Sequence, residues 1–127
     1  MEDNKMKYLW TTINVEDMDG SIDFYSDVAG LKVLKRFQAA PGIEIAFMGN
    51  GTDNETLIEL LADSSNGTID FSEFISIGFS VDSVDTMLET IKSKNISVHS
   101  GPFETPGFKF FCIKDPDGLQ VQFFQHK

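Results

Sequence analysis

Hydrophobic and polar positions follow the same order twice along this chain. The stretch YLWTTINV (8–15) alternates as a β-strand does, and the residues after it, EDMDGSIDFYSDVAG, carry apolar side chains at helical spacing. We expect a helix over 17–29 that is stopped by Gly30. Three short apolar runs follow and predict strands, namely LKVLKRFQ, IEIAFMG and TLIELLAD, with turn-forming residues between them.

A polar connection over 63–74 comes next, and then the pattern returns. FISIGFSV (74–81) predicts a strand and DSVDTMLETIKSKN predicts a helix over 82–94, after which ISVHSG, FKFFCIK and LQVQFF predict three strands. The segments WTTINVEDMDGSIDFY and SIGFSVDSVDTMLETI keep register without a gap, in an alignment that begins with Trp10 on Ser76. We therefore expect an internal duplication into two βαβββ modules, about 6–63 and 72–127.

The last two predicted strands are joined by the tetrapeptide DPDG, residues 115–118. Pro116 fits the second position of a type I turn, Asp115 can accept hydrogen bonds from the turn backbone, and Gly118 relieves the exit. The sequence therefore predicts a hairpin. Gln120 and Gln122 share one face of its second strand, where a half-buried sheet carries either solvent-facing residues or a site.

Composition narrows the classes of partner. A chain of 127 residues with 41% hydrophobic and 24% charged residues is typical of one globular domain. Its net charge of −10 repels phosphate backbones and anionic membranes, so we expect neither nucleic acid nor a membrane as partner. The single cysteine, Cys112, excludes an intrachain disulfide, and no apolar run resembles a leader or a membrane span. We expect a cytoplasmic protein.

Paired βαβββ modules with VEDMDGSIDFYSDVAGLKVL early and KDPDGLQVQFF at the end resemble the vicinal oxygen chelate superfamily. That superfamily includes glyoxalase I, the extradiol dioxygenases, the fosfomycin-resistance enzymes and the bleomycin-resistance binding proteins. The resemblance covers essentially the whole chain, 1–127, as a single domain. It implies an α+β fold in which two tandem βαβββ modules form a cupped, barrel-like mixed sheet with helices outside, and it implies a homodimer. The motifs specify the superfamily but no activity, because fold and function separate widely.

Metal-using members of the superfamily place four ligands at positions that correspond here to Trp10, Glu59, Ser76 and Gln122. An indole N–H is a donor that cannot bind a cation, and the serine hydroxyl and glutamine carbonyl are neutral. Only Glu59 carries charge, and neither of the two histidines, His99 and His126, lies at a ligand position. Because divalent ions need several imidazoles or carboxylates, we expect no metal and no cofactor.

Strand alternation places Ser76, Gly78 and Ser80 on the face opposite the second helix, and Trp10 lies on the equivalent face of the first module. The candidate ligand-binding residues are Trp10, Thr12, Asn14, Glu59, Ser76, Gln122 and Phe124. A structural role is open for several of them, since Trp10 could be a core residue and Gln122 a solvent-facing one. Together they predict an apolar, partly aromatic cavity for a small, partly aromatic molecule.

Two functions stay open. The first, which we favour, is a metal-free protein of the bleomycin-resistance kind that sequesters or senses a small molecule. The alternative is a glyoxalase I-like lyase that isomerises a thiohemiacetal, with an altered metal site and Glu59 as catalytic base. That reaction needs an electrophile to stabilise an enediolate, and Lys109 is the only cation that we expect at a suitable strand position.

Overall fold

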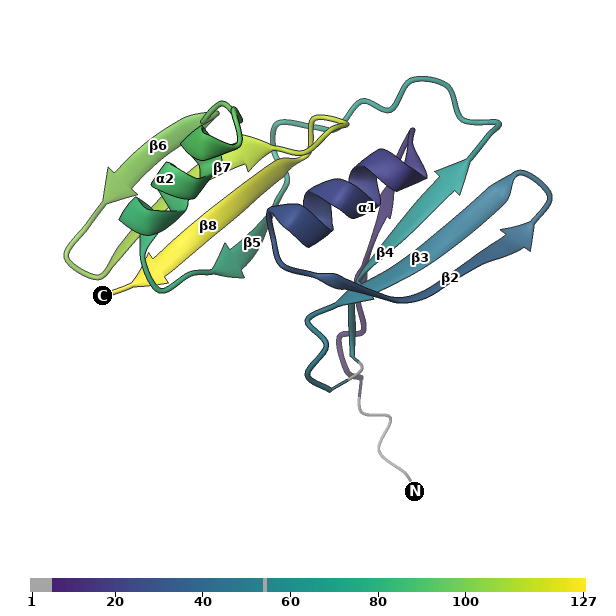
Figure 1. Ribbon diagram of the computed structural model, residues 1–127, viewed down its shortest axis with the longest axis horizontal. Coiled ribbons are helices and arrows are strands. Elements are labelled where there is room, and N and C mark those ends of the chain that lie inside the picture. The colour runs from purple at the N-terminus through teal and green to yellow at the C-terminus, as the bar shows by residue number, and fades with distance from the viewer. Residues whose placement is uncertain (1–5, 54) are drawn as a thin grey trace. The chain divides into compact units, whose positions relative to one another are not determined.

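The protein is described by a computed structural model that covers residues 6–53 and 55–127 (Figure 1). The described residues up to Thr68 form one compact unit, and Ile69–Lys127 form a second. Each unit holds one helix and a four-stranded mixed sheet. The predicted α+β fold with two βαβββ modules is therefore confirmed.

The first unit consists of one helix and four strands: β1 (Thr11–Asn14), α1 (Met18–Asp27), β2 (Lys32–Ala40), β3 (Ile43–Gly49) and β4 (Thr56–Asp63). Its strand order is β1-β4-β3-β2. β1 runs parallel to β4, and the other two pairs are antiparallel. The parallel pair results from the course of the chain, which crosses over the sheet as α1 and returns through β2 and β3.

One face of this sheet is apolar and lies under α1 (Figure 1). Met18 and Tyr25 of the helix are buried, and so is a set of strand residues on the facing side: Ile13, Ala46, Met48, Ile58 and Leu60. Their alternation along the strands follows from the two-residue period of a pleated sheet. The helix ends earlier than the predicted range 17–29, and the chain then passes through Gly30 at a φ of 71°.

The second unit repeats this arrangement with β5 (Ser76–Ser80), α2 (Val84–Ser93), β6 (Ser100–Glu104), β7 (Phe108–Lys114) and β8 (Gln120–His126). Its order is β5-β8-β7-β6, and its β5–β8 pair is parallel. The alignment of Trp10 with Ser76 also matches the two helices at both ends, the first residue of α1 with that of α2 and the last with the last. The bounds of the helices therefore agree with the predicted duplication. Ser76 pairs with Gln120, and Trp10 lies one residue before the β1–β4 ladder.

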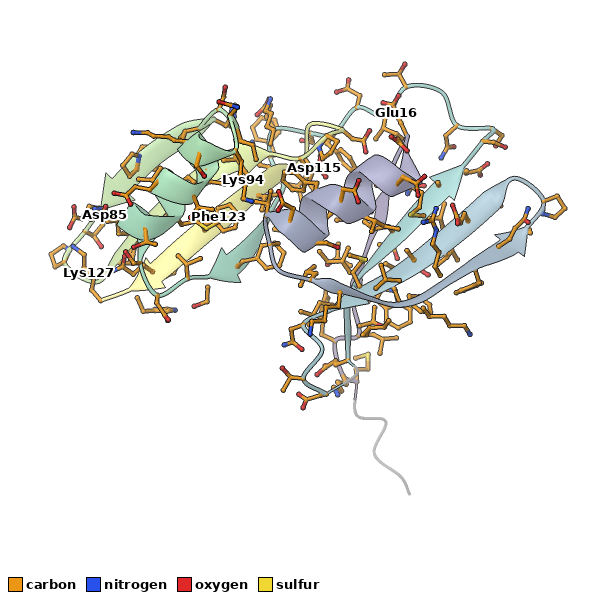
Figure 2. All side chains as sticks on the ribbon, in the orientation of Figure 1. Glu16, Asp85, Lys94, Asp115, Phe123 and Lys127 are labelled. Atoms are coloured by element: carbon orange, nitrogen blue, oxygen red, sulfur yellow. The ribbon has the colours of Figure 1, made fainter. Side chains whose placement is uncertain are left out.

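The core of the second unit lies between its sheet and α2. Phe111, Ile113, Val121 and Phe123 are almost completely buried, and Figure 2 shows Phe123 beneath α2. Burial of a large aromatic side chain stabilises such a small layer by roughly 2–3 kcal/mol. Neither helix in the described part of the chain is long and apolar enough to cross a membrane.

The predicted strands differ most from the observed ones at two N-terminal ends. The first is expected over 8–15 but begins at Thr11, and Tyr8 and Leu9 before it are exposed. The strand expected over 96–101 begins at Ser100 instead. The backbone of Ile96 donates to Ile91 and so belongs to the end of α2, where Asn95 has a φ of 59°. Helix termination therefore uses residues whose apolar pattern resembles a strand.

The predicted DPDG hairpin is confirmed at the level of its hydrogen bonds. Oδ1 of Asp115 accepts from the backbone N–H of Asp117 and of Leu119, each at 2.9 Å, and the N–H of Gly118 donates to the carbonyl of Asp115 at 3.0 Å. Gly118 has a φ of 94°, a value that side chains disfavour. Asp115 is 5% exposed at the corner of the hairpin (Figure 2).

Candidate functional site

The face opposite α1 carries the candidate residues of the first unit. Thr12 of β1 is opposite Glu59 of β4, and Glu59 is opposite Phe47 of β3, which is opposite Lys35 of β2. These four side chains form one row across the sheet, because residues that are directly paired share a face. In the described part of the unit, no helix covers this face.

Glu59 lies half-buried in the middle of this row. Its Oε1 accepts a hydrogen bond from the hydroxyl of Thr12 at 2.5 Å. Among the residues that the structure describes, Thr12 is its only hydrogen-bond partner, and no cation forms a salt bridge with it. The carboxylate is therefore oriented by a neutral group and keeps one oxygen for a ligand.

Aromatic rings lie on the same face as this carboxylate, and one of them belongs to Phe47, its cross-strand neighbour. The ring of Trp10 lies 5.1 Å from that of Phe47, and Phe47 lies 5.6 Å from Phe37 of β2. Since β4 lies between β1 and β3, the rings of Trp10 and Phe47 meet across the strand that carries Glu59. Lys35 places its Nζ 4.9 Å from the centre of the Phe37 ring, a cation–π distance.

The equivalent row of the second unit has no charge. Gly78 of β5 is opposite Gln122 of β8, which is opposite Cys112 of β7, and Cys112 is opposite Ser100 of β6. This register makes Gln122 the counterpart of Glu59 and Gly78 the counterpart of Thr12. A Cβ at Gly78 would lie 3.4 Å from Oε1 of Gln122, so no side chain there orients the amide. Cys112 is buried and its thiol is free.

Rings of the second unit gather one row further along the same face. Phe124 lies 5.1 Å from Phe108 and 6.1 Å from Phe110, and its ring also meets that of His126 at 4.9 Å. Phe103 of β6 adds a contact to Phe110 at 5.2 Å. Phe124 is a predicted site residue, whereas its neighbours are found only from the strand register.

Two further candidate residues, Asn14 and Ser76, do not contact Glu59 or the aromatic rings in any described interaction. Oδ1 of Asn14 accepts from Nδ2 of Asn66 at 3.4 Å, and Ser76 is an exposed residue at the start of β5. The structure thus brings Thr12 and Glu59 into contact and places Trp10 against Phe47, the cross-strand neighbour of Glu59. Among the described residues, Asn14 and Ser76 lie outside these contacts.

The expectation that Lys109 is the available cation is wrong. Its ammonium group lies 2.7 Å from Oδ1 of Asp85 on α2, and this hydrogen bond raises the pKa of Lys109. Lys109 is paired with Gln125, on the helix side of the sheet, so it does not share a face with Gln122. Lys35 stands on the open face of the first unit, in the same row as Glu59. Sequence alternation could not identify it, because β2 has register shifts between Val33 and Lys35 and between Gln38 and Ala40.

A polar cluster lies at one end of the second sheet. Glu73 accepts from Lys114 at 2.9 Å and from Nε2 of Gln120 at 2.9 Å, and Nε2 of His99 is 3.5 Å from it. The hydrogen bond from Lys114 is the main cause that lowers the pKa of Glu73, with a smaller contribution from His99. The Glu73 carboxylate therefore has partners for its oxygens within the unit. We interpret the cluster as structural, because it joins the connecting segment to the sheet.

A hollow of about 380 Å³ in the first unit is lined by three acidic residues, Glu16, Glu44 and Asp63. Glu44 already binds Arg36 at 2.6 Å, and Asp63 accepts from Ser65. Glu44 and Asp63 are therefore engaged within the unit, and the hollow shares none of the predicted site residues.

The donor set does not fit a divalent metal ion. In the first unit, the ring of Trp10 packs against Phe47 and offers only an N–H, which leaves the single carboxylate of Glu59. In the second unit, Ser76 and Gln122 supply neutral oxygens alone. The described residues include no group of three or more His, Cys, Asp or Glu side chains that could hold a metal. The charge that normally offsets dehydration of the ion is missing from each set.

Comparison with known proteins agrees with this fold and shows the range of its functions. The profile of the Glyoxalase/Bleomycin resistance protein/Dioxygenase superfamily matches residues 7–123. A lactoylglutathione lyase of Neisseria meningitidis serogroup A is 29% identical, over 96% of this chain and 92% of its own length. The uncharacterized protein YwbC of Bacillus subtilis is 33% identical, over 91% and 94% of the two chains. Among solved structures, the antibiotic binding protein TnmS3 of a Streptomyces species has a TM-score of 0.75 at 18% identity, covering 99% of this chain and 100% of its own.

The chain therefore belongs to the Glyoxalase/Bleomycin resistance protein/Dioxygenase superfamily. The similarity to the lyase agrees with this family, and the similarity to the antibiotic binding protein shows the fold alone. Both leave the activity open.

Proposed function

We propose that this protein binds a small organic molecule without a metal ion. The observation that carries the proposal is the pair of equivalent positions at Glu59 and Gln122. One holds a carboxylate bound only to the Thr12 hydroxyl, and the other holds an amide with no charged neighbour in its row. The resemblance to metal-using members of the superfamily implies that these positions hold metal ligands there, and here they supply one carboxylate and no imidazole.

The chemistry of the open faces supports a binding function. Each face combines aromatic rings with a few polar groups, and that combination is typical of sites for small molecules. Half-buried rings give affinity through apolar contact, whereas a carboxylate or an amide fixes the orientation of the ligand. Sequestration and sensing both need such a site and no reactive group.

The lyase alternative rests on the 29% identity to the Neisseria enzyme and on Glu59, which could act as a base. The alternative lacks, among the described residues, an electrophile, which the reaction needs to stabilise an enediolate. Lys109 is engaged with Asp85 on the helix side, and Lys35 lies over the Phe37 ring on the far side of Phe47 from Glu59. No described cation therefore stands next to Glu59 to stabilise an enediolate.

Thermal unfolding and a lyase assay together test the proposal. We expect the melting temperature to be the same in chelator and in excess Zn²⁺, Ni²⁺ or Mn²⁺, and we expect no turnover of a glutathione thiohemiacetal. A metal at a hundred times its Kd would add roughly 2.7 kcal/mol, which is easily detected. A metal-dependent melting shift that disappears in Glu59→Ala, accompanied by turnover, would replace the binding function with the lyase.

A cytoplasmic location, a homodimeric state and the lack of a nucleic-acid partner remain predictions from the sequence. We include the homodimer in the proposal, because each sheet has edge strands of its own, β1 and β2 in one and β5 and β6 in the other. Edge strands with free backbone groups favour association.

A further inference from the structure

We infer that the open face of the first unit recognises an organic cation: an ammonium group on an apolar or aromatic body. The inference deepens the proposed binding function and depends on it. It concerns the charge of the ligand, which family membership leaves open.

The first step of the argument is the state of Glu59. This half-buried carboxylate has one neutral partner, Thr12, and no salt bridge with any described residue. Two other glutamates of the unit form salt bridges, Glu44 with Arg36 at 2.6 Å and Glu55 with Lys7 at 3.7 Å. A partly desolvated carboxylate gains from a cationic partner more than an exposed one does, because the surrounding dielectric is lower.

The second step is the ring environment. Trp10 and Phe47 meet across β4 with their ring centres 5.1 Å apart, beside the carboxylate on that strand. The faces of aromatic rings attract cations, and tryptophan does so most strongly. A carboxylate flanked by two rings can hold an ammonium group through its charge while the rings cover the apolar body of the ligand.

The third step is the position of the cation that the face already has. Lys35 rests on Phe37 at 4.9 Å and is separated from Glu59 by Phe47 in the same row. The Phe37 ring on this face thus accepts an ammonium group. Because Lys35 lies over Phe37, it does not occupy the space beside Glu59, Trp10 and Phe47. A net charge of −10 also raises the local concentration of cations and disfavours anionic ligands.

Three probes of matched shape test the inference: benzylammonium, benzyl alcohol and benzoate. Trp10 is the only tryptophan, so its fluorescence and its single indole N–H resonance report on the proposed site alone. We expect benzylammonium to bind about tenfold more tightly than benzyl alcohol, a difference of about 1.4 kcal/mol. Benzoate should bind most weakly, and the preference for the cation should shrink with added salt.

Glu59→Gln should abolish this preference, because the amide keeps the shape of the side chain and removes the charge that attracts the ammonium group. The matched control is Asp23→Asn, which removes one carboxylate from the exposed side of α1, on the other face of the same unit, and should keep the preference. Melting curves confirm that each variant is folded. If Glu59→Gln unfolds, Glu59→Asp provides the second variant and should retain the preference.

Three results would overturn the inference in different ways. Equal affinity for benzylammonium and benzyl alcohol would mean that the face binds apolar bodies regardless of charge, and the proposed binding function would survive. Tighter binding of benzoate would assign the selectivity to Lys35. If none of the three probes changes the fluorescence or the indole resonance of Trp10, both the cation site and the proposed binding function of this face are wrong.

Discussion

Glu59 differs from the other carboxylates of the chain in its surroundings rather than in its chemistry. A hydroxyl donor at 2.5 Å orients it, rings flank it and no described cation neutralises it. Its counterpart Gln122 has the same place in the register of the second unit, without charge and without a side chain at Gly78. The two units therefore present one charged and one neutral row at equivalent positions of their sheets.

Asp115 is the residue whose loss we expect to cost the most stability outside the apolar core. It is 5% exposed, and its carboxylate accepts two backbone N–H groups at 2.9 Å. Asp115→Ala leaves both donors without that acceptor, so we expect a loss of roughly 2–3 kcal/mol in the free energy of unfolding. Urea denaturation measures it, and Asp70→Ala, at an exposed carboxylate, is the control. A loss below about 0.5 kcal/mol, within the range of ordinary surface changes, would show that the turn does not depend on this side chain.

The helices of the two units allow a comparison between equivalent elements. Ser83 caps α2 by accepting from the N–H of Thr86 at 3.1 Å, and Oε1 of Gln125 accepts from Val84 at 2.8 Å. Asp17, the counterpart of Ser83 in the first unit, is the N-cap residue of α1, yet its side chain makes no capping hydrogen bond. The two helix starts are therefore held differently.

We expect Ser83→Ala to lower the free energy of unfolding by about 1 kcal/mol, the usual value of a cap. Asp17→Ala should cost clearly less, because no capping hydrogen bond is lost and only attraction to the helix dipole changes. Chemical denaturation of the two variants side by side gives the comparison. Equal losses, or a larger loss at Asp17, would contradict the difference in capping.

At the scale of elements, the sequence predicts what depends on local pattern. Both helices, the hairpin at Asp115 and most of the strands follow from periodicity and turn chemistry, since these act over a few residues. The predicted start of β6 is wrong because Ile96 continues an apolar pattern while its N–H bonds to the end of α2. Lys35 and Phe47 are absent from the predicted site because their face depends on pairing with distant strands and on the bulges of β2.

For the predicted site as well, local pattern identifies some features, and others depend on packing between distant strands. Trp10, Thr12 and Glu59 could be named because strand alternation and the alignment of the two halves place them on one face. That Thr12 orients Glu59, and that Trp10 contacts Phe47, follows from side-chain packing across three strands. Sequence periodicity has no information on such contacts.

At the scale of the whole molecule, the two units share a topology and differ in what their open faces offer. The strand orders β1-β4-β3-β2 and β5-β8-β7-β6 are equivalent, so the fold alone does not distinguish a lyase from a binding protein. Our proposal of a binding function rests instead on the side chains at the equivalent positions. Trp10 and Glu59 in one unit and Ser76 and Gln122 in the other offer a single carboxylate and no imidazole, which is a poor set of ligands for a metal ion.

Native mass spectrometry of the protein as purified tests this account most directly, because it reports metal content and assembly in one spectrum. We expect twice the chain mass of 14.2 kDa, no mass increment of a divalent metal, and no change of mass after treatment with a chelator. Any additional mass should be that of an organic molecule, released on unfolding. One Zn²⁺ or Ni²⁺ per chain, lost in Glu59→Ala, would contradict the account and establish a metal site that involves Glu59.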